Sequence, residues 1–263
     1  MIVACLKWVT HPGEPHDARF AGMSPADQSA LEFALAQATA TGAEVTVVTV
    51  GPQAAESVLR DAVACGAHHA IRIHAQAALT SAQVAEAIST AVPSAQWVWC
   101  GDYSLDRGTG SVPAFLAANL VAQQALGVIA VELSDDGPVM ATRRLDGGRR
   151  EVLSVCAPAI ISVEGATSHL RRAGLGALRT ASHVQIEVRQ PASVAHADDD
   201  VIYPYRPRAR ALAAPRGAHP LDRLRALTDA GGTAPAHGES VVLEPTEAAE
   251  RIVAALRTWG YLE

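Results

Sequence analysis

The sequence predicts an α/β protein built on a doubly wound, mostly parallel sheet, with an added β-hairpin and an extended C-terminal arm. Runs of β-branched and other apolar residues alternate with segments of helical periodicity through the first two-thirds of the chain. These runs are apolar throughout, as expected of strands buried on both faces. Single helices between such strands require parallel pairing through right-handed crossovers, which defines a doubly wound fold.

The alternation begins with the apolar strand Ile2–Val9. The helix Asp27–Thr39 follows, in which Leu31 and Leu35 stand one helical turn apart, and then the β-branched strand Glu44–Val50. The pattern continues with the helix Ala54–Ala64, the strand Ala70–His74, the helix Ser81–Thr90, the strand Gln96–Cys100, the helix Ser111–Leu126 and the strand Gly127–Leu133.

The pattern changes after Leu133. Asp146-Gly147-Gly148 is typical of a tight hairpin turn, and the strand segments Pro138–Leu145 and Arg149–Val155 flank it. Three further segments follow: the buried strand Ala159–Val163, an irregular stretch from Gly165 to Arg179, and the short strand candidate Val184–Val188.

The last part of the chain has a different composition. From Pro191 to Pro245 it is rich in Pro, Ala, Arg, His and Asp with little periodicity, so it cannot build a core of its own. The amphipathic helix Thr246–Trp259 closes the chain. We therefore expect a domain of residues 1–190 that carries the site, and a tail of residues 191–263 that wraps a partner.

Composition excludes several classes of protein. The net charge is −6 and there is no basic block, which argues against a nucleic-acid partner. No apolar run is long enough to cross a bilayer, and the opening MIVACLKWV reads as a strand rather than a signal peptide. The cysteines are widely spaced and no metal-ligand cluster is present, so we expect free thiols, no metal and a cytoplasmic location. These cysteines are Cys5, Cys65, Cys100 and Cys156.

Ligands of open α/β sheets bind outside the carboxyl ends of the strands. Lys7, the only lysine, follows the first strand, and Val50-Gly51-Pro52 ends the second. The first helix opens with Ser24-Pro25-Ala26-Asp27, in which serine suits the N-cap, proline the first helical position, and aspartate a bond returned to the cap. Two interpretations of these residues are equally good: they serve only to start the helix, or they also bind a ligand at its N-terminus.

The glycine-rich loop after the fourth strand is the strongest candidate for a binding site. It enters a helix, so its backbone N–H groups can face a phosphate. It contains no P-loop lysine and does not follow the first strand, which excludes a P-loop and an ordinary NAD site. A plain surface loop is the alternative. The candidate residues are Gly101, Asp106, Gly108, Thr109, Gly110, Ser111 and Val112.

No set of residues suggests covalent or acid–base catalysis. The histidines stand in loops and strand starts without a matching Cys or Ser, so structural or solvated roles suit them better. They include His68, His69, His74, His169 and His183.

Eight segments stand in an informative order. They are Cys5-Leu6-Lys7; Ser24-Pro25 before Ala30–Leu35; Val45–Pro52; Leu59–Ile71; the loop from Gly101 to Ala117; Arg144–Arg149; Ala157–Glu164; and Val242–Gly260. In this order they resemble the beta subunit of electron transfer flavoproteins nearly end to end. Within the loop, Leu105-Asp106 and Thr109–Val112 match the nucleotide loop of that family.

The resemblance implies a Rossmann-like, adenine-nucleotide-binding subunit that carries electrons and is not an enzyme. It implies AMP, or in some branches a second FAD, in the loops above. It also implies an alpha subunit that holds the redox FAD near the interface, a flavin-dependent dehydrogenase as electron donor, and a downstream acceptor. By register, the implied nucleotide contacts are Cys5, Ser24, Pro25, Ala26, Asp27, Val50 and Gly101–Val112, and we add Lys7 from its position at the strand end.

Two departures from the family pattern are informative. In the docking loop Arg171–Arg179, Leu175 aligns with the leucine that inserts into partner dehydrogenases, but the Pro-Asn pair and the lysines of the family are absent. This implies an unusual dehydrogenase, and it would suit the branch associated with the redox cofactor mycofactocin. Arg107 replaces a small or acidic residue of the family's loop, so the sequence does not decide whether the bound nucleotide is AMP or FAD.

Two other interpretations use the same fold. A nucleotide-hydrolysing or AMP-transferring enzyme would need a catalytic set after the first strand, which Thr10-His11-Pro12-Gly13 does not supply. A stress-type ATP- or AMP-binding protein would be a simpler homodimeric domain, and the hairpin and the long C-terminal region argue against it.

Overall fold

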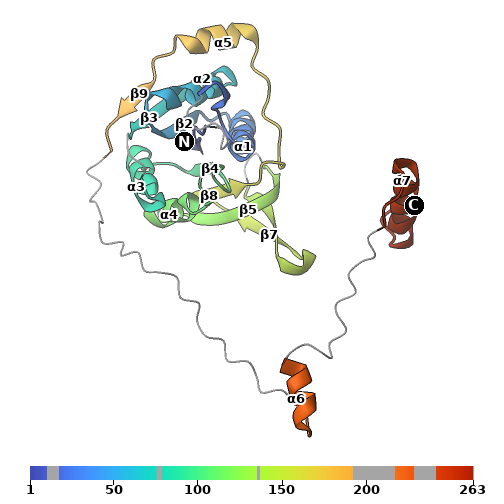
Figure 1. The fold of residues 1–263 in the computed structure, drawn as a ribbon. Coiled ribbons are helices and arrows are strands. Elements are labelled where there is room, and N and C mark those ends of the chain that lie inside the picture. The colour runs from blue at the N-terminus through green and yellow to red at the C-terminus, as the bar shows by residue number, and fades with distance from the viewer. Residues whose placement is uncertain (11–17, 76–78, 135–136, 192–216, 228–240, 263) are drawn as a thin grey trace. The chain divides into compact units, whose positions relative to one another are not determined.

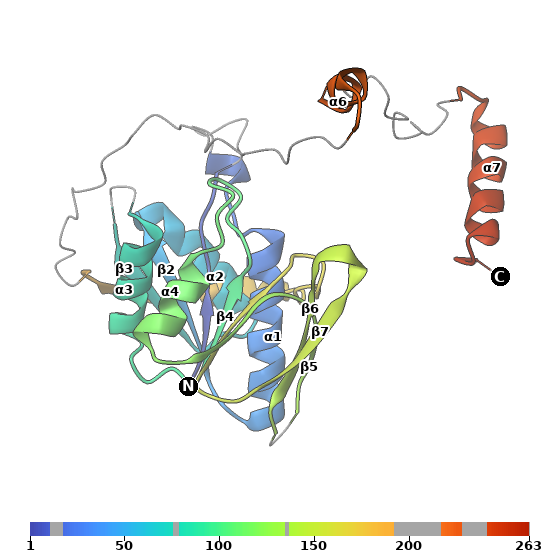
Figure 2. The same cartoon turned by 90° about the horizontal axis from the view of Figure 1, so that it is seen from below.

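The computed structural model describes residues 1–10, 18–75, 79–134, 137–191, 217–227 and 241–262. It divides into two units, Met1–Asp198 and Asp199–Glu263. The first unit is an α/β domain with one nine-stranded, mostly parallel sheet (Figures 1 and 2). The fold class predicted from the sequence is therefore confirmed.

The strand order of the sheet is β7-β6-β5-β8-β4-β1-β2-β3-β9. Strand β1 pairs in parallel with β2 on one side and with β4 on the other, so the topological switch point lies between β1 and β4. Strand β6 pairs antiparallel with both β5 and β7, and β6 and β7 form the predicted hairpin. The strands are β1 Ile2–Cys5, β2 Val45–Gly51, β3 His69–His74, β4 Trp97–Gly101, β5 Gln123–Glu132, β6 Val139–Arg144, β7 Arg150–Val155, β8 Ala159–Val163 and β9 Glu187–Arg189.

Helices cover both faces of the sheet. Helices α1 and α2 pack on one face, and α3 and α4 pack on the other (Figure 1). The helices of this unit are α1 Pro25–Thr41, α2 Glu56–Ala64, α3 Ser81–Ala91, α4 Val112–Asn119 and α5 Leu175–Ser182, with short 3-10 turns at Ala18–Phe20, Gln53–Ala55 and Asp146–Gly148.

The start of α1 follows from its local sequence. The Ser24 hydroxyl accepts a hydrogen bond from the Asp27 backbone N–H at 3.0 Å, and Pro25 occupies the first turn. The return bond that we expected from Asp27 to the cap is replaced by a longer-range one. Its carboxylate accepts from the backbone N–H of Lys7, two residues after β1, at 3.1 Å. The first helix is therefore tied directly to the first strand.

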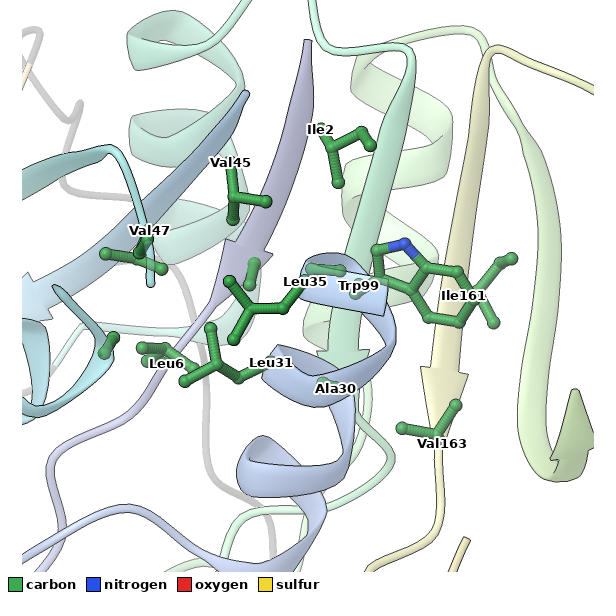
Figure 3. Close-up of a cluster of buried hydrophobic side chains, with 14 of the residues drawn as sticks. Ile2, Leu6, Ala30, Leu31, Leu35, Val45, Val47, Trp99, Ile161 and Val163 are labelled. Atoms are coloured by element: carbon green, nitrogen blue, oxygen red, sulfur yellow. The ribbon is translucent and has the colours of Figure 1, made fainter. Parts of the chain in front are cut away.

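Trp99 of β4 lies at the centre of the core on the α1 face. Figure 3 shows it beside Ile161, with Leu31 and Leu35 of α1 facing the strands. Trp99 is fully buried, its ring stacks on Phe33 with centroids 5.3 Å apart, and its indole N–H donates to Gln37 Oε1 at 2.9 Å. One side chain thus fixes α1 against the strand that leads into the glycine-rich loop.

We expect Trp99→Ala to lower the free energy of unfolding by about 3–5 kcal/mol, because it leaves a large cavity and an unpaired buried amide. Urea denaturation followed by circular dichroism measures this loss. Trp259→Ala is the control, since Trp259 is 69% exposed and its removal should change little. Equal losses of unfolding free energy for the two substitutions would contradict the claim that Trp99 stabilises the core.

The expected helix Ser111–Leu126 was too long. Helix α4 ends at Asn119, where Val121 adopts φ of 50° and the Ala122 N–H donates to the Ala117 carbonyl at 2.9 Å. Strand β5 begins at Gln123, earlier than the expected Gly127. Gly127, with φ of 68°, lies inside β5 where the pairing with β8 shifts register, so it marks a bulge instead of a strand start.

The stretch expected to be irregular, Gly165–Arg179, contains the start of α5. No side chain caps this helix, whose N-cap is Gly174, so the usual start signal is missing. The following strand is also shorter than the expected Val184–Val188. Val184 and Ile186 pack into the core, and pairing with β3 begins only at Glu187.

The second unit contains α6, Pro220–Leu227, and α7, Pro245–Thr258, which starts one residue before the predicted helix and ends one residue before its end. Ile252 on α7 is exposed. The other parts of the predicted tail, residues 192–216 and 228–240, lie outside the described residues. Within the described ranges, no helix combines the length and the apolar character needed to span a membrane.

Candidate functional site

A cavity of about 340 Å³ opens at the carboxyl edge of the sheet, around the switch point between β1 and β4. Its walls come from the segments that follow β1, β2, β3 and β4 and from the starts of α1, α3 and α4. This volume is at the small end of the range for ligand sites. The glycine-rich loop thus borders an open space, and side chains do not fill the notch beside the first strand.

The structure places most of the predicted site residues around this cavity. Those that line it are Cys5, Lys7, Ser24, Asp27, Val50, Gly101, Asp106, Thr109, Gly110 and Val112. Pro25, Ala26, Gly108 and Ser111 do not. Pro25 and Ala26 leave no room for a side chain at Gly165, and Ala26 also abuts Gly101. Gly108 forms a turn within the loop with φ of 63°, and Ser111 precedes α4.

The buried carboxyl group of Asp27 holds the two strands of the switch point together. It accepts hydrogen bonds from the backbone N–H groups of Lys7 after β1 and of Gly101 at the end of β4. A β-carbon on Gly101 would lie 2.6 Å from Asp27 Oδ1, so only glycine fits. Burial raises the pKa of Asp27 to about 7, although its hydrogen bonds to Lys7, Ser24 and Gly101 act in the opposite direction.

The loop from β4 to α4 folds back on itself. The Ser104 N–H donates to the Thr109 carbonyl at 2.9 Å, and the Gly108 N–H donates to the Ser104 carbonyl at 2.7 Å. A β-carbon on Gly110 would lie 1.8 Å from the carbonyl oxygen of Asp102. The loop can therefore close in this way only with glycine at position 110.

Two cationic side chains line the cavity and tie its walls together. Lys7 Nζ lies 2.6 Å from Asp106 Oδ1, and Arg107 donates to the Leu79 carbonyl at 2.8 Å. Burial acts to raise the pKa of Asp106, but the hydrogen bond and charge of Lys7 outweigh it and the pKa is lowered. The site therefore combines positive charge with the start of a helix, which suits an anionic group.

Cys5 and Cys100 line the inner end of the cavity. Their strands pair in parallel, with Ala4 opposite Trp99, so the two cysteines follow side by side. The hydrogen bond with Cys5, together with burial, raises the pKa of the Cys100 thiol well above its usual value. Cys100 stays a neutral thiol and contributes a soft, apolar surface instead of a nucleophile.

Sequence reasoning missed one wall of the cavity, the connection between β3 and α3. Ala75 follows β3, Leu79 and Ser81 precede and begin α3, and all three line the cavity. The same strand-end rule that identified the other loops applies here, and Thr80 with Gln83 forms a capping box that marks the helix start. The segment was overlooked because it contains no glycine or charged side chain. Tyr103 and Arg107 also line the cavity without having been selected as site residues.

Comparison with known proteins identifies the family. The profile of the electron transfer flavoprotein domain matches residues 17–211. The chain belongs to the electron transfer flavoprotein family. The electron transfer flavoprotein subunit beta of Chromohalobacter salexigens is 30% identical over 243 residues, which cover 88% of this chain and 86% of the relative.

Two further relatives are also beta subunits of electron transfer flavoproteins. The one from Dictyostelium discoideum is 29% identical over 175 residues, 65% of this chain and 69% of the relative. The one from Thermoanaerobacterium thermosaccharolyticum is 33% identical over 144 residues, 53% of this chain and 55% of the relative, so the match spans little more than half of that protein. The resemblance to beta subunits is thus confirmed. Beta subunits of electron transfer flavoproteins are electron carriers and not enzymes.

Proposed function

We propose that this chain is the beta subunit of a heterodimeric electron transfer flavoprotein and that the cavity at the switch point holds AMP. The alpha subunit would hold the redox FAD near the shared interface. That FAD would supply the electron chemistry, while this chain would bind the adenylate and form part of the docking surface. The proposal rests above all on the open cavity between the ends of β1 and β4, bordered by a glycine loop that leads into α4.

The start of α4 fits a phosphate. Ser111 at the N-cap makes no side-chain hydrogen bond to the helix, so the N–H groups of Val112 and Ala114 have no side-chain cap, while Pro113 between them has no N–H. Val112, at the first helical position, lines the cavity. Uncapped N–H groups and the positive end of the helix dipole form a common phosphate site. Lys7 and Arg107 add positive charge across the same space.

The size of the cavity favours AMP over a second FAD. At about 340 Å³ it suits a mononucleotide better than a dinucleotide. Arg107 contributes to this limit, because its bond to the Leu79 carbonyl joins the loop after β4 to the segment before α3. AMP in this site would therefore be a structural ligand, with FAD confined to the interface with the alpha subunit.

Helix α5 and the C-terminal tail are the proposed contacts with other proteins. Leu175 at the start of α5 is 84% exposed, as expected of a side chain that inserts into a flavin-dependent dehydrogenase. The apolar residues exposed on α7, among them Ile252, would be covered by the alpha subunit. The four cysteines are free thiols, which is consistent with a cytoplasmic protein.

We expect Lys7→Met to weaken AMP binding about tenfold while it changes the free energy of unfolding by less than about 1 kcal/mol. The reason is that Lys7 is 40% exposed in a surface ion pair but faces the proposed phosphate. Isothermal titration with AMP and with adenosine measures the effect. Adenosine, which has no phosphate, should bind the unsubstituted chain and the Lys7→Met variant with the same affinity. A similar loss for both ligands would contradict a phosphate contact by Lys7.

The proposed function is tested by coexpressing the chain with its alpha subunit and releasing the bound nucleotides. Mass spectrometry should find one FAD and one AMP per heterodimer. Two FAD and no AMP would contradict AMP in this cavity and support a second flavin. A chain that self-associates and ignores the alpha subunit in light scattering would contradict the heterodimer.

A further inference from the structure

Helix α5 is fixed at its two ends and exposed between them. Before the helix, the Arg171 guanidinium binds the Glu32 carboxylate of α1, with Nη2 2.8 Å from Oε1, and the Arg171 backbone N–H donates to Oε2 at 2.9 Å. At its other end, Ala181 is buried and the chain enters the core. Leu175 and Leu178 stay exposed. The docking surface is therefore a short helix supported by its ends.

Arg60 of α2 holds the C-terminal end of α5. Its Nη1 donates to the Val184 carbonyl at 2.6 Å and, at 3.4 Å each, to the carbonyls of Ala181 and Ser182. The last carbonyls of a helix have no partner within the helix and carry the negative end of its dipole. A guanidinium at this position caps them and opposes their charge. These contacts join segments 121 to 124 residues apart in the chain.

Arg60 is itself fixed by a partly buried ion pair with Glu56. Glu56 accepts from Arg60 Nη2 through Oε2 and from Arg72 Nε through Oε1, both at 3.1 Å. Arg72 is a buried residue of β3, and its Nη1 donates to the Gly51 carbonyl at 3.2 Å. Gly51 lines the cavity. A continuous set of charge-assisted hydrogen bonds thus joins the cavity wall to the end of α5.

We propose that Arg60, held by Glu56 and Arg72, is a positioning residue that sets the place of α5 and its exposed Leu175 relative to the nucleotide cavity. This inference rests on the proposed function in one respect, that α5 is the docking helix. An ion pair that only stabilised α2 would need Glu56 and Arg60 alone, four residues apart. The bonds to the Ala181 and Ser182 carbonyls at the end of α5, and to the Val184 carbonyl just after it, support a role of this guanidinium beyond α2.

The test is hydrogen exchange of the full chain, read by mass spectrometry over peptides that cover residues 174–189. Arg60→Met keeps the bulk of the side chain but removes every donor. We expect it to speed amide exchange in α5 about tenfold, as the loss of a charge-assisted cap predicts. Peptides from α1 and β4 should exchange as in the unsubstituted chain. Arg150→Met is the matched control, since it removes an exposed arginine of β7, outside α5 and outside the peptides that are read.

Arg60→Lys separates charge from geometry. A lysine keeps the charge but cannot serve Glu56 and the carbonyls with a planar fork, so we expect exchange in α5 between that of the unsubstituted chain and that of the methionine variant. If Arg60→Met does not fold, the test rests on Arg60→Lys, which should show faster amide exchange in the α5 peptides than the unsubstituted chain. Unchanged α5 exchange in folded variants, or an equal rise throughout the domain, would overturn the proposal.

Adding AMP to the same samples distinguishes this inference from the proposed function. Protection of peptides from the loop after β4 reports on the nucleotide site. Its absence in the unsubstituted chain would contradict AMP binding, while the effect of Arg60 on α5 would still stand. Conversely, normal AMP protection with no effect of Arg60 would overturn only the positioning role.

Discussion

Replacing Gly110 with alanine should raise the Kd for AMP at least about 100-fold, a loss of about 2.7 kcal/mol. The new β-carbon would lie 1.8 Å from the carbonyl oxygen of Asp102, and the next nearest backbone atom, the Asp102 carbon, is 3.0 Å away. Backbone atoms cannot rotate aside as a flexible side chain can. The loop must therefore open, which moves Val112 and the start of α4 away from the ligand.

Isothermal titration with AMP measures this loss, and circular dichroism shows that the sheet remains folded. Gly22→Ala is the matched control, because a β-carbon there meets nothing within 4 Å and the glycine does not have a positive φ. The control should bind AMP as the unsubstituted chain does. A folded Gly110→Ala variant with a Kd within about threefold of the original would rule out the loop as the phosphate site.

The second large effect is a pH dependence of stability that comes from Asp27. Its pKa rises from 3.8 to about 7 on folding, which corresponds to about 4 kcal/mol. Below pH 4 the Asp27 carboxyl is protonated in both the folded and the unfolded chain, so its burial does not lower the free energy of unfolding. As the pH rises to 7, the unfolded chain releases this proton and the folded chain retains it, so the folded state loses stability. The loss is complete above pH 7, where both states are ionised.

Urea denaturation of the unsubstituted chain and of Asp27→Asn, from pH 5 to pH 8, isolates this contribution. The other titrating groups are common to both proteins, so the difference between their free energies of unfolding reports on Asp27. We expect the unsubstituted chain to lose about 3 kcal/mol relative to the variant over this range. A constant difference would mean that Asp27 titrates near its ordinary pKa in the folded protein.

The sequence predicts well those features that depend on neighbouring residues, such as helix starts and the order of strands and helices. Ser24 suits an N-cap and Pro25 suits the first helical position, so together they mark the start of α1, and apolar strands separated by single helices imply parallel pairing. The strand-end rule then places Lys7, Val50 and the glycine loop at one edge of the sheet before any coordinates are known. The cavity lies at that edge.

The parts that could not be predicted depend on contacts distant in sequence. Nothing near Arg60 indicates that it caps carbonyls more than 120 residues later. Asp27 reads as a helix-start residue, and only the folded chain shows it bridging β1 and β4. Gly127 was misread because a glycine between apolar residues marks a break as well as a bulge, and its pairing with β8 decides between them.

The central claim is that the turn leaving β4 and the start of α4 hold the phosphate of an adenine nucleotide. A crystal structure of the chain with AMP, bound to its alpha subunit, tests it most directly. We predict density for one AMP between the ends of β1 and β4, its phosphate within hydrogen-bonding distance of the backbone N–H groups from Thr109 to Val112. AMP bound elsewhere, or a cavity filled by FAD, would contradict the claim.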